Sequence, residues 1–272
     1  MAAKARAVPS ALLGAALPSS AEELPELPEI EREHVQRVYD AIALEWHGTR
    51  YKAWPRVASF VGRLPRASLI ADLGCGNGKM HAACAAHGHL AIGCDFSAAL
   101  VRICALQLRM EAQAADVTAL PYRAAVFDAA LSIAVLHHVS TVGRRRRLVR
   151  ETLRVLRPGG QALFYAWAKE QAAGRSGHVF PSADVFVPFH QRLTRAEGEE
   201  AAAEHKRPRE EGAAEGVAAA FDPEKRAVVH QRYCHVYAEG ELRELVESVE
   251  GFRVLEEYYD TGNWCILAEK AA

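Results

Sequence analysis

Two aspartates and a glycine-rich loop occur where a nucleoside could be bound. The loop, residues 72–78, follows an apolar run, and its glycines permit a tight turn and a close approach of the backbone to a ligand. Asp95 ends the next apolar run, where its carboxylate could accept hydrogen bonds from two ribose hydroxyls. Asp116 follows a third run, where it could accept from an adenine amino group. Each aspartate alone could instead cap a helix, but the combination favours a nucleoside ligand.

The elements that position these residues follow from hydrophobic periodicity. Short apolar runs alternate with helical segments, a pattern that predicts a parallel sheet with helices on both faces. We expect helices within 29–63 and over 239–249. Strands are expected at 69–73, 90–95, 113–115, 127–135 and 160–167, with a closing hairpin of 252–259 and 264–268. The predicted fold is α/β, with a seven-stranded, mostly parallel, Rossmann-like sheet.

One domain is expected, from residue 29 to residue 270. Residues 1–28 are rich in Ala and Pro, and we interpret them as a disordered tail. Because Lys4 and Arg6 precede a short apolar run, a transit peptide is the alternative. Residues 195–227 consist mainly of Ala, Glu, Arg and Gly with almost nothing to bury. They are interpreted as a solvated insertion, helical at most in part.

Composition excludes several classes of protein. The formal net charge is −1, so any contact with nucleic acid must come from a local basic patch. No apolar run reaches the roughly 18 residues of a membrane-spanning helix. No cysteine belongs to a CxxC pair, so we expect small core residues in a reducing compartment and no metal site. The cysteines are Cys75, Cys84, Cys94, Cys104, Cys234 and Cys265.

The GxGxG spacing after Asp72 resembles class I S-adenosylmethionine-dependent methyltransferases more than the GxGxxG of dinucleotide-binding proteins. Residues 127–138 and 154–160 resemble further motifs of the same class. The resemblance implies that S-adenosylmethionine is the cofactor, with the glycine loop near its methionine part. The predicted cofactor-binding residues are Asp72, Gly74, Cys75, Gly76, Asn77, Gly78, Asp95, Asp116, Val117 and Ile133.

Segments outside the cofactor loop resemble a narrower family. They are residues 33–43, 49–55, 132–138, 184–189, 232–237 and 258–264. Together with the glycine loop they resemble the tRNA 5-carboxymethyluridine methyltransferases, a family that includes the methyltransferase domain of an AlkB-like tRNA hydroxylase. The resemblance spans about residues 29–194 and 230–270. Two departures are Glu45-Trp46-His47, where the family has His-Phe-Ser, and Phe96 in place of a basic residue.

The resemblance implies an enzyme that methylates the carboxylate of 5-carboxymethyluridine at the wobble position of tRNA. We expect it in the cytoplasm, with the nucleus as an additional location. It also implies a partner, a small zinc-containing activator subunit that covers an apolar strip. A carboxylate with a pKa of about 4 is already nucleophilic at neutral pH, so no general base is expected. Two other functions stay open: methylation of a small-molecule or lipid carboxylate, and a non-catalytic binding module. The complete glycine loop and both cofactor carboxylates argue against the second.

Four side chains are candidates for the substrate site. Arg50 is the first candidate to grip the substrate carboxylate, since a guanidinium can pair with both oxygens. His137 follows the fourth predicted strand, on the rim where substrates of this fold enter. Arg232 and His235 come from the segment that follows the insertion. Each of the four could instead have a structural role.

Aromatic and basic residues could contact the tRNA itself. Tyr39, Trp54 and Trp264 could stack on an extruded base, although plain core packing is the commoner role of such rings. A run of arginines between residues 144 and 157 could contact phosphates, or could form a solvated helix face. These arginines are Arg144, Arg145, Arg146, Arg147, Arg150, Arg154 and Arg157.

Overall fold

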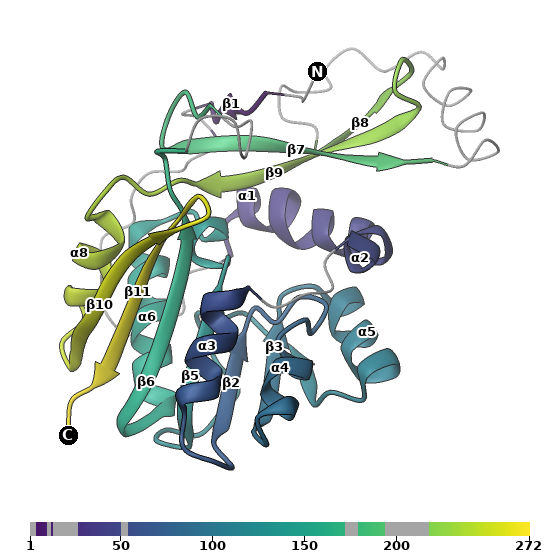
Figure 1. Cartoon of the computed structure of the whole chain (residues 1–272). Helices are drawn as coiled ribbons and strands as arrows, with labels where there is room; N and C mark the ends of the chain where they lie inside the picture. Colours follow the sequence, from purple (N-terminus) through teal and green to yellow (C-terminus); the bar gives the residue numbers. More distant parts are fainter. Residues whose placement is uncertain (1–3, 10–11, 13–26, 50–53, 172–178, 194–217) are drawn as a thin grey trace.

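The computed structural model of the chain describes residues 4–9, 12, 27–49, 54–171, 179–193 and 218–272. A seven-stranded main sheet runs through its centre (Figure 1). In chain order its strands are β2 (Leu69–Leu73), β3 (Leu90–Asp95), β4 (Ala112–Ala114), β5 (Phe127–Ile133), β6 (Leu156–Trp167), β10 (Phe252–Asp260) and β11 (Asn263–Lys270).

The strand order in the main sheet is β10-β11-β6-β5-β2-β3-β4. The five strands from β6 to β4 are parallel to their neighbours, whereas β11 is antiparallel to both β6 and β10. The seven-stranded, mostly parallel sheet predicted from the alternating pattern is therefore confirmed, including its closing hairpin.

Helices pack on both faces of the main sheet (Figure 1). They are α3 (Pro55–Arg63), α4 (His81–Ala86), α5 (Ala98–Leu108), α6 (Val142–Val155) and α8 (Glu241–Glu247). On one face, Val57 of α3 shares an apolar core with Ile70 of β2. On the other face, Leu148 of α6 and Val246 of α8 share a core with Phe164 of β6. The two apolar layers hold the sheet rigid, so the loops at its edge have fixed positions.

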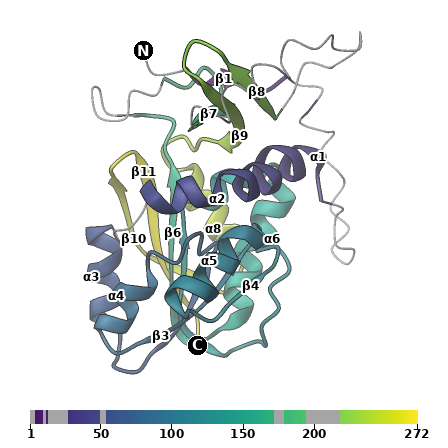
Figure 2. The ribbon, with the colours of Figure 1, turned by 90° about the vertical axis from the view of Figure 1, so that its right-hand side faces the viewer.

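An N-terminal helical segment lies between the main sheet and a second sheet (Figures 1 and 2). It consists of α1 (Glu29–Glu31), the π-helical turn η2 (Arg32–Gln36) and α2 (Arg37–Thr49). Ile30 and Val35 of this segment share a buried cluster with Phe186 and Tyr233 of the second sheet. Contacts between α2 and α5 attach the other side of the segment to the main domain.

The second sheet is a difference from the sequence-based expectation. Its strands are β1 (Arg6–Ala7), β7 (Asp184–Arg192), β8 (Ala219–Asp222) and β9 (Ala227–His235), in the antiparallel order β1-β7-β9-β8. Strand β1 lies in the expected disordered tail, and β8 lies in the expected insertion. Both are edge strands with partly or fully exposed side chains, so backbone hydrogen bonds rather than apolar burial hold them. Residues 194–217 lie outside the described part of the chain.

The structure also bears on membrane-spanning helices and on the cysteines. Among these residues, no helix is both long enough and apolar enough to cross a membrane. All six cysteines are buried, and none forms a disulfide bond. They therefore fill small spaces in the core, as their apolar surroundings in the sequence indicate.

Candidate active site

A cavity opens between the N-terminal helical segment and the carboxyl ends of β2, β3, β4 and β5. Its roof consists of Glu31, Val35, Gln36, Tyr39 and Trp46. Most of the predicted cofactor residues line it: Gly74, Cys75, Gly76, Asn77, Asp95, Asp116, Val117 and Ile133. In open α/β sheets this edge is where ligands bind, because the loops that leave parallel strands meet there.

The glycines of the loop have different roles. Gly74 has a φ of +73°, and a Cβ at this position would clash with Val135, so only glycine fits. Gly76 has a φ of +56°, and a Cβ there would meet nothing within 4 Å. Its backbone therefore faces open space in the cavity, where a ligand can approach. Gly78 lies outside the cavity, and a Cβ there would come within 2.7 Å of Leu108 in α5.

Asp95 presents its carboxylate to the cavity. Its Oδ2 accepts a hydrogen bond from the Gly76 N–H at 2.8 Å, and its Oδ1 accepts from the Ser97 N–H at 2.9 Å. Burial raises the pKa of Asp95 to about 6, although these two backbone N–H groups oppose the shift. Each oxygen keeps one lone-pair site, which suits a pair of ribose hydroxyls.

Asp72, also a predicted cofactor residue, is 2% exposed and does not line the cavity. Its Oδ2 is buried and has no hydrogen-bond partner among the described residues. Burial raises its pKa to about 7, and the positive charge of Lys79, which lines the cavity, opposes that shift. A buried polar atom without a partner costs free energy, so this oxygen suits a polar ligand group or a water molecule. The loop and Asp95 therefore fit a nucleoside, and the buried charge of Asp72 behind them would favour a cationic group on the ligand.

Arg232 of β9 lies next to the roof of the cavity in an aromatic box. Its guanidinium carbon is 5.5 Å from the ring centre of Trp46, 5.6 Å from that of Phe189 and 5.9 Å from that of Trp167. The side chain is only 6% exposed, and its Nε has no hydrogen-bond partner. Within the described part of the chain, no carboxylate forms an ion pair with it. Burying a cation without an anion costs free energy, and a bound anion would offset that cost.

Tyr39 and His138 connect this box to the cofactor cavity, whose wall they share. The Tyr39 hydroxyl lies 2.8 Å from Nε2 of His138, and Nδ1 of His138 lies 2.8 Å from the Tyr233 carbonyl oxygen. Because a carbonyl only accepts, Nδ1 carries the proton and Tyr39 donates to Nε2. Burial lowers the pKa of His138 to about 3, with Arg232 acting in the same direction. His138 is therefore a neutral acceptor that orients Tyr39.

Comparison with known proteins agrees with this geometry. Residues 71–164 match the model of a family described as a methyltransferase domain. A tRNA (carboxymethyluridine(34)-5-O)-methyltransferase from Schizosaccharomyces pombe is 39% identical over 243 residues, which cover 89% of this chain and 98% of the relative. This chain belongs to the tRNA (carboxymethyluridine(34)-5-O)-methyltransferase family.

The similarity extends to longer proteins and to solved structures. A family member from Xenopus tropicalis is 35% identical over 276 residues, covering 89% of this chain and 41% of the relative. The chain thus spans less than half the length of that methyltransferase. A chain in the complex between the Haloferax volcanii Trm112 methyltransferase activator and a putative methyltransferase superposes with a TM-score of 0.54 at 15% identity, covering 88% of this chain and 98% of that one. At this identity, the similarity to the archaeal chain shows a shared fold.

The four candidates for the substrate site lie in different places. Arg232 is beside the cavity, as described above, and Arg50 lies outside the described residues. His137 does not line the cavity. Its ring stacks on Trp167 with centres 5.0 Å apart, and its Nδ1 accepts from the Trp167 N–H at 3.3 Å. Burial, followed by the positive charge of neighbouring groups, holds the pKa of His137 well below its usual value. It supports a wall of the aromatic box.

His235 is engaged on both ring nitrogens. Its Nδ1 lies 3.0 Å from Asp184 and its Nε2 lies 2.7 Å from Glu241. Burial opposes protonation, but hydrogen bonds to these two carboxylates outweigh it and raise the pKa of His235 above its ordinary value. The structure thus gives His235 a structural role, joining β7, β9 and the start of α8, rather than a contact with substrate.

The three aromatic candidates for base stacking are also separated. Tyr39 lines the cavity. Trp54 packs edge-on against Tyr165, with ring centres 5.2 Å apart, and Trp264 packs against Tyr259 at 5.3 Å. Neither tryptophan lines the cavity. Trp46 and His138 are further site residues that the sequence pattern does not indicate, apart from the position of His138 directly after His137.

The arginine run fits neither of its two predicted roles as a whole. Arg144 and Arg145 are buried, and Arg144 forms ion pairs within the domain. Arg154 pairs with Glu151 in the same helix at 2.7 Å. Arg146 and Arg150 are exposed on α6. Tertiary contacts therefore occupy much of the run, and only a few of its members are available to phosphates.

One group of potential metal ligands occurs in the described part of the chain. Ligand atoms of His137, His138 and Cys234 lie within 4.8 Å of one another, and all three residues are buried. Arg232 interacts electrostatically with each of them. A fixed positive charge beside the group disfavours a metal cation, whereas it favours an anion in the adjacent box.

Proposed function

We propose that this chain transfers a methyl group from S-adenosylmethionine to the carboxylate of 5-carboxymethyluridine at the wobble position of tRNA. The product is the methyl ester. Family membership supports the reaction, and the names of the fungal and amphibian relatives describe it. The nucleoside-binding features of the cavity support the cofactor. Gly76 would approach the methionine part, Asp95 would hold the ribose and Asp116 would accept from the adenine.

The observation that carries the proposal is the aromatic box around Arg232. A guanidinium presents parallel N–H groups that match both oxygens of a carboxylate. In this box it is dehydrated, lacks an anion among the described residues and stands beside the cofactor cavity. An anionic side arm on a planar base would be held by the guanidinium and enclosed by the rings. Arg50, outside the described residues, stays a second candidate for the same grip.

The chemistry needs alignment rather than proton transfer. Bound S-adenosylmethionine supplies a methyl group on a sulfonium. One carboxylate oxygen forms the new O–C bond with its own electron pair, and the electrons of the broken C–S bond stay on sulfur. No proton moves, which agrees with a neighbouring histidine, His138, whose pKa burial lowers to about 3. Arg232 would hold the oxygen in line with the methyl group, and proximity of this kind accounts for much of the barrier reduction.

The aromatic walls contribute by excluding water. Opposite charges cancel as the methyl group is transferred, so a dry surrounding favours the step. Trp46, Trp167 and Phe189 surround the guanidinium with apolar surface. Removing water from the carboxylate is costly, and the charge of Arg232 offsets that cost.

The test is methyl transfer from labelled S-adenosylmethionine to tRNA that carries 5-carboxymethyluridine, followed by mass spectrometry of the nucleosides. With intact tRNA we expect the methyl ester. With tRNA that was digested by nuclease before the reaction, we expect no methyl transfer. Transfer that survives nuclease treatment would instead indicate a small-molecule carboxylate. Failure to bind the cofactor in calorimetry would indicate a non-catalytic binding module.

We also propose that a small activator subunit docks at the β4 edge of the main sheet. Strand β4 ends the sheet, so its outer edge pairs with no other described strand. Nearby on α5, Leu106 is 70% exposed, and Leu44 on α2 lines the same shallow groove at 76% exposure. The solved complex of a methyltransferase of this fold with the Trm112 activator supports a partner of that kind. A subunit that covers Leu44 and Leu106 would stabilise the folded chain, because binding to the folded state shifts the folding equilibrium toward it.

Co-expression tests this partner. We expect the chain alone to be poorly soluble or poorly active, and the activator to restore both. Leu106→Asp should prevent the rescue, whereas Leu90→Asp should not, because Leu90 is also exposed but lies at the amino end of β3. A soluble and fully active chain without any partner would contradict the proposal.

A further inference from the structure

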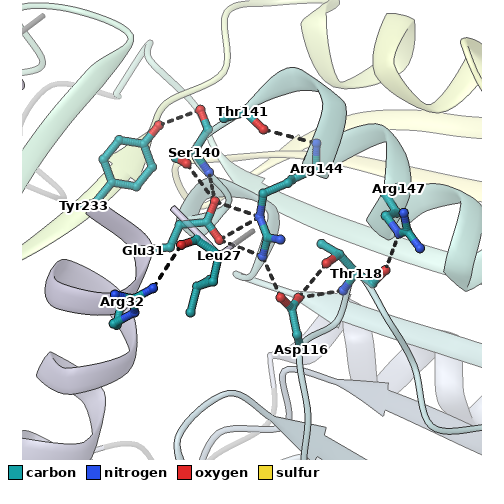
Figure 3. A network of polar contacts seen from close by, with 10 residues as sticks. All are labelled: Leu27, Glu31, Arg32, Asp116, Thr118, Ser140, Thr141, Arg144, Arg147 and Tyr233. Atoms are coloured by element: carbon teal, nitrogen blue, oxygen red, sulfur yellow. Dashed lines mark hydrogen bonds and ion pairs between the residues drawn. The ribbon is translucent and has the colours of Figure 1, made fainter. Parts of the chain in front are cut away.

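A buried ion network joins Glu31, in the roof of the cofactor cavity, to Asp116 in the lining on the main domain (Figure 3). Its first member is Glu31 in α1, which is 3% exposed. Its Oε1 accepts from both the N–H and the hydroxyl of Ser140, each at 2.7 Å. The same carboxylate pairs with Arg144 of α6, whose Nε lies 3.1 Å from both of its oxygens. Glu31 is thus held by a fixed set of donors in the domain.

Arg144 also reaches the opposite side of the cavity. Its Nη2 donates to Oδ2 of Asp116 at 2.6 Å while it pairs with Glu31 at 3.0 Å. One buried guanidinium is therefore shared by two carboxylates, both of which line the cavity. Figure 3 shows Arg144 between them, with the N-terminal segment on one side and the loop after β4 on the other.

The hydrogen bonds of Asp116 leave a single direction for a ligand. Its Oδ1 accepts from the N–H and the hydroxyl of Thr118, both at 2.8 Å, which fills the two lone-pair sites of that oxygen. Its Oδ2 accepts from Arg144 and keeps one site. Arg144 therefore determines where the remaining acceptor site of Asp116 points.

The position of the roof depends on the ion pair between Glu31 and Arg144. Val35, Gln36, Tyr39 and Trp46 all follow Glu31 in the N-terminal helical segment and line the cavity. Glu31 stands at the start of that segment, and its partners Ser140 and Arg144 belong to the main domain. The contacts of Glu31 with Ser140 and Arg144 therefore set the distance between the N-terminal helical segment and the loops of the main domain.

We propose that Arg144 is a positioning residue for the cofactor: it aims Asp116 at the adenine amino group and fastens the N-terminal helical segment over the bound nucleoside. This inference rests on the proposed cofactor site. Because one guanidinium serves both carboxylates, cofactor binding and closure of the roof stabilise each other. The ligand recognised in this way is one with an exocyclic amino group at the position of adenine N6.

Two ligands separate positioning from a merely structural role. S-adenosylhomocysteine has the amino group, and S-inosylhomocysteine has an oxygen in its place. Calorimetry with the full chain, in complex with its activator if solubility requires it, measures both affinities. In Arg144→Lys we expect S-adenosylhomocysteine to bind about tenfold more weakly, the loss of one charge-assisted contact. The inosine analogue lacks the amino group, so it should lose only the smaller contribution of the roof, less than about threefold. Arg150→Gln, an exposed position on the same helix, is the matched control and should bind as the wild type does.

Hydrogen exchange tests the roof. In the wild type, S-adenosylhomocysteine should increase protection of residues 29–49. In Glu31→Gln, which keeps the shape but removes the charge, that gain should be largely lost and affinity should fall. This variant decides the proposal even if Arg144→Lys does not fold.

The outcomes are distinct. Equal weakening of both ligands in Arg144→Lys, or an unchanged gain of protection in Glu31→Gln, would overturn the positioning role. A wild-type chain that binds neither ligand would overturn the cofactor site itself. Wild-type binding together with normal tRNA methylation, but without discrimination between the ligands, would leave the proposed function in place and remove this inference.

Discussion

Replacing Arg232 with methionine should separate activity from stability. Methionine has a similar length and keeps apolar contact with the rings, but it removes the charge. Arg232 is 6% exposed and has no described carboxylate partner, so its burial costs several kcal/mol. Contacts with three rings return roughly 0.5–2 kcal/mol each. The two terms nearly cancel, so we expect the Arg232→Met chain to melt within a few degrees of the wild type or above it.

Activity should change far more. Loss of a bidentate, charge-assisted contact to the substrate carboxylate removes roughly 3 kcal/mol, which lowers kcat/KM by more than about a hundredfold. Arg232→Lys should recover only part of the rate, because an ammonium group cannot match both oxygens. Cofactor affinity should stay within about twofold in both variants. The assay is methyl transfer to tRNA bearing 5-carboxymethyluridine, with Arg66→Gln, an exposed position between α3 and β2, as the control for a lost surface charge.

Two results would refute this reasoning. Wild-type turnover by Arg232→Met would place the carboxylate grip elsewhere. A large fall in melting temperature would show that the guanidinium has a structural partner. The pH profile is a further check: kcat should be flat from about pH 7 to pH 9, since the carboxylate is already ionised there. A steep rise through this range would instead indicate a general base.

Four further predictions concern other parts of the chain. Asp95→Ala should weaken cofactor binding by roughly 2–4 kcal/mol in calorimetry, and unchanged affinity would exclude Asp95 from the site. At pH values below about 6 the affinity of the wild type should decrease, because protonation of Asp95 removes hydrogen-bond acceptors. Carboxylate partners raise the pKa of His235 above its ordinary value despite burial, so the stability it contributes should be complete in acid and lost as pH rises through the raised pKa. Denaturation curves from pH 5 to 9 should show this loss in the wild type and not in His235→Gln. Replacing residues 195–217 with a short linker should leave melting temperature and cofactor affinity nearly intact, because that stretch lacks core-forming residues; the deletion stops before β8, and cooperative loss of folding would contradict it. If Arg50 shares the grip on the carboxylate, Arg50→Ala should abolish methylation while sparing cofactor binding, and normal turnover would leave the role to Arg232 alone.

The sequence by itself determined the main sheet and the cofactor edge. Parallel strands covered on both faces need continuous apolar runs, so β2, β3 and β5 are visible as such runs. Consecutive strand–helix units bring the carboxyl ends of the strands together. Asp95 and Asp116 could therefore be placed beside the glycine loop without any tertiary information, since Asp95 ends β3 and Asp116 comes shortly after β4.

Only the tertiary structure decided the substrate side. The aromatic box takes Trp46 from α2, Trp167 from β6 and Phe189 from β7, and no local periodicity connects these positions. Residue type alone made Arg232 and His235 equal candidates. Their partners distinguish them: His235 lies between two carboxylates, whereas Arg232 lies among rings that cannot neutralise its charge. Burial and pairing are properties of the folded chain, because they depend on which distant segments meet.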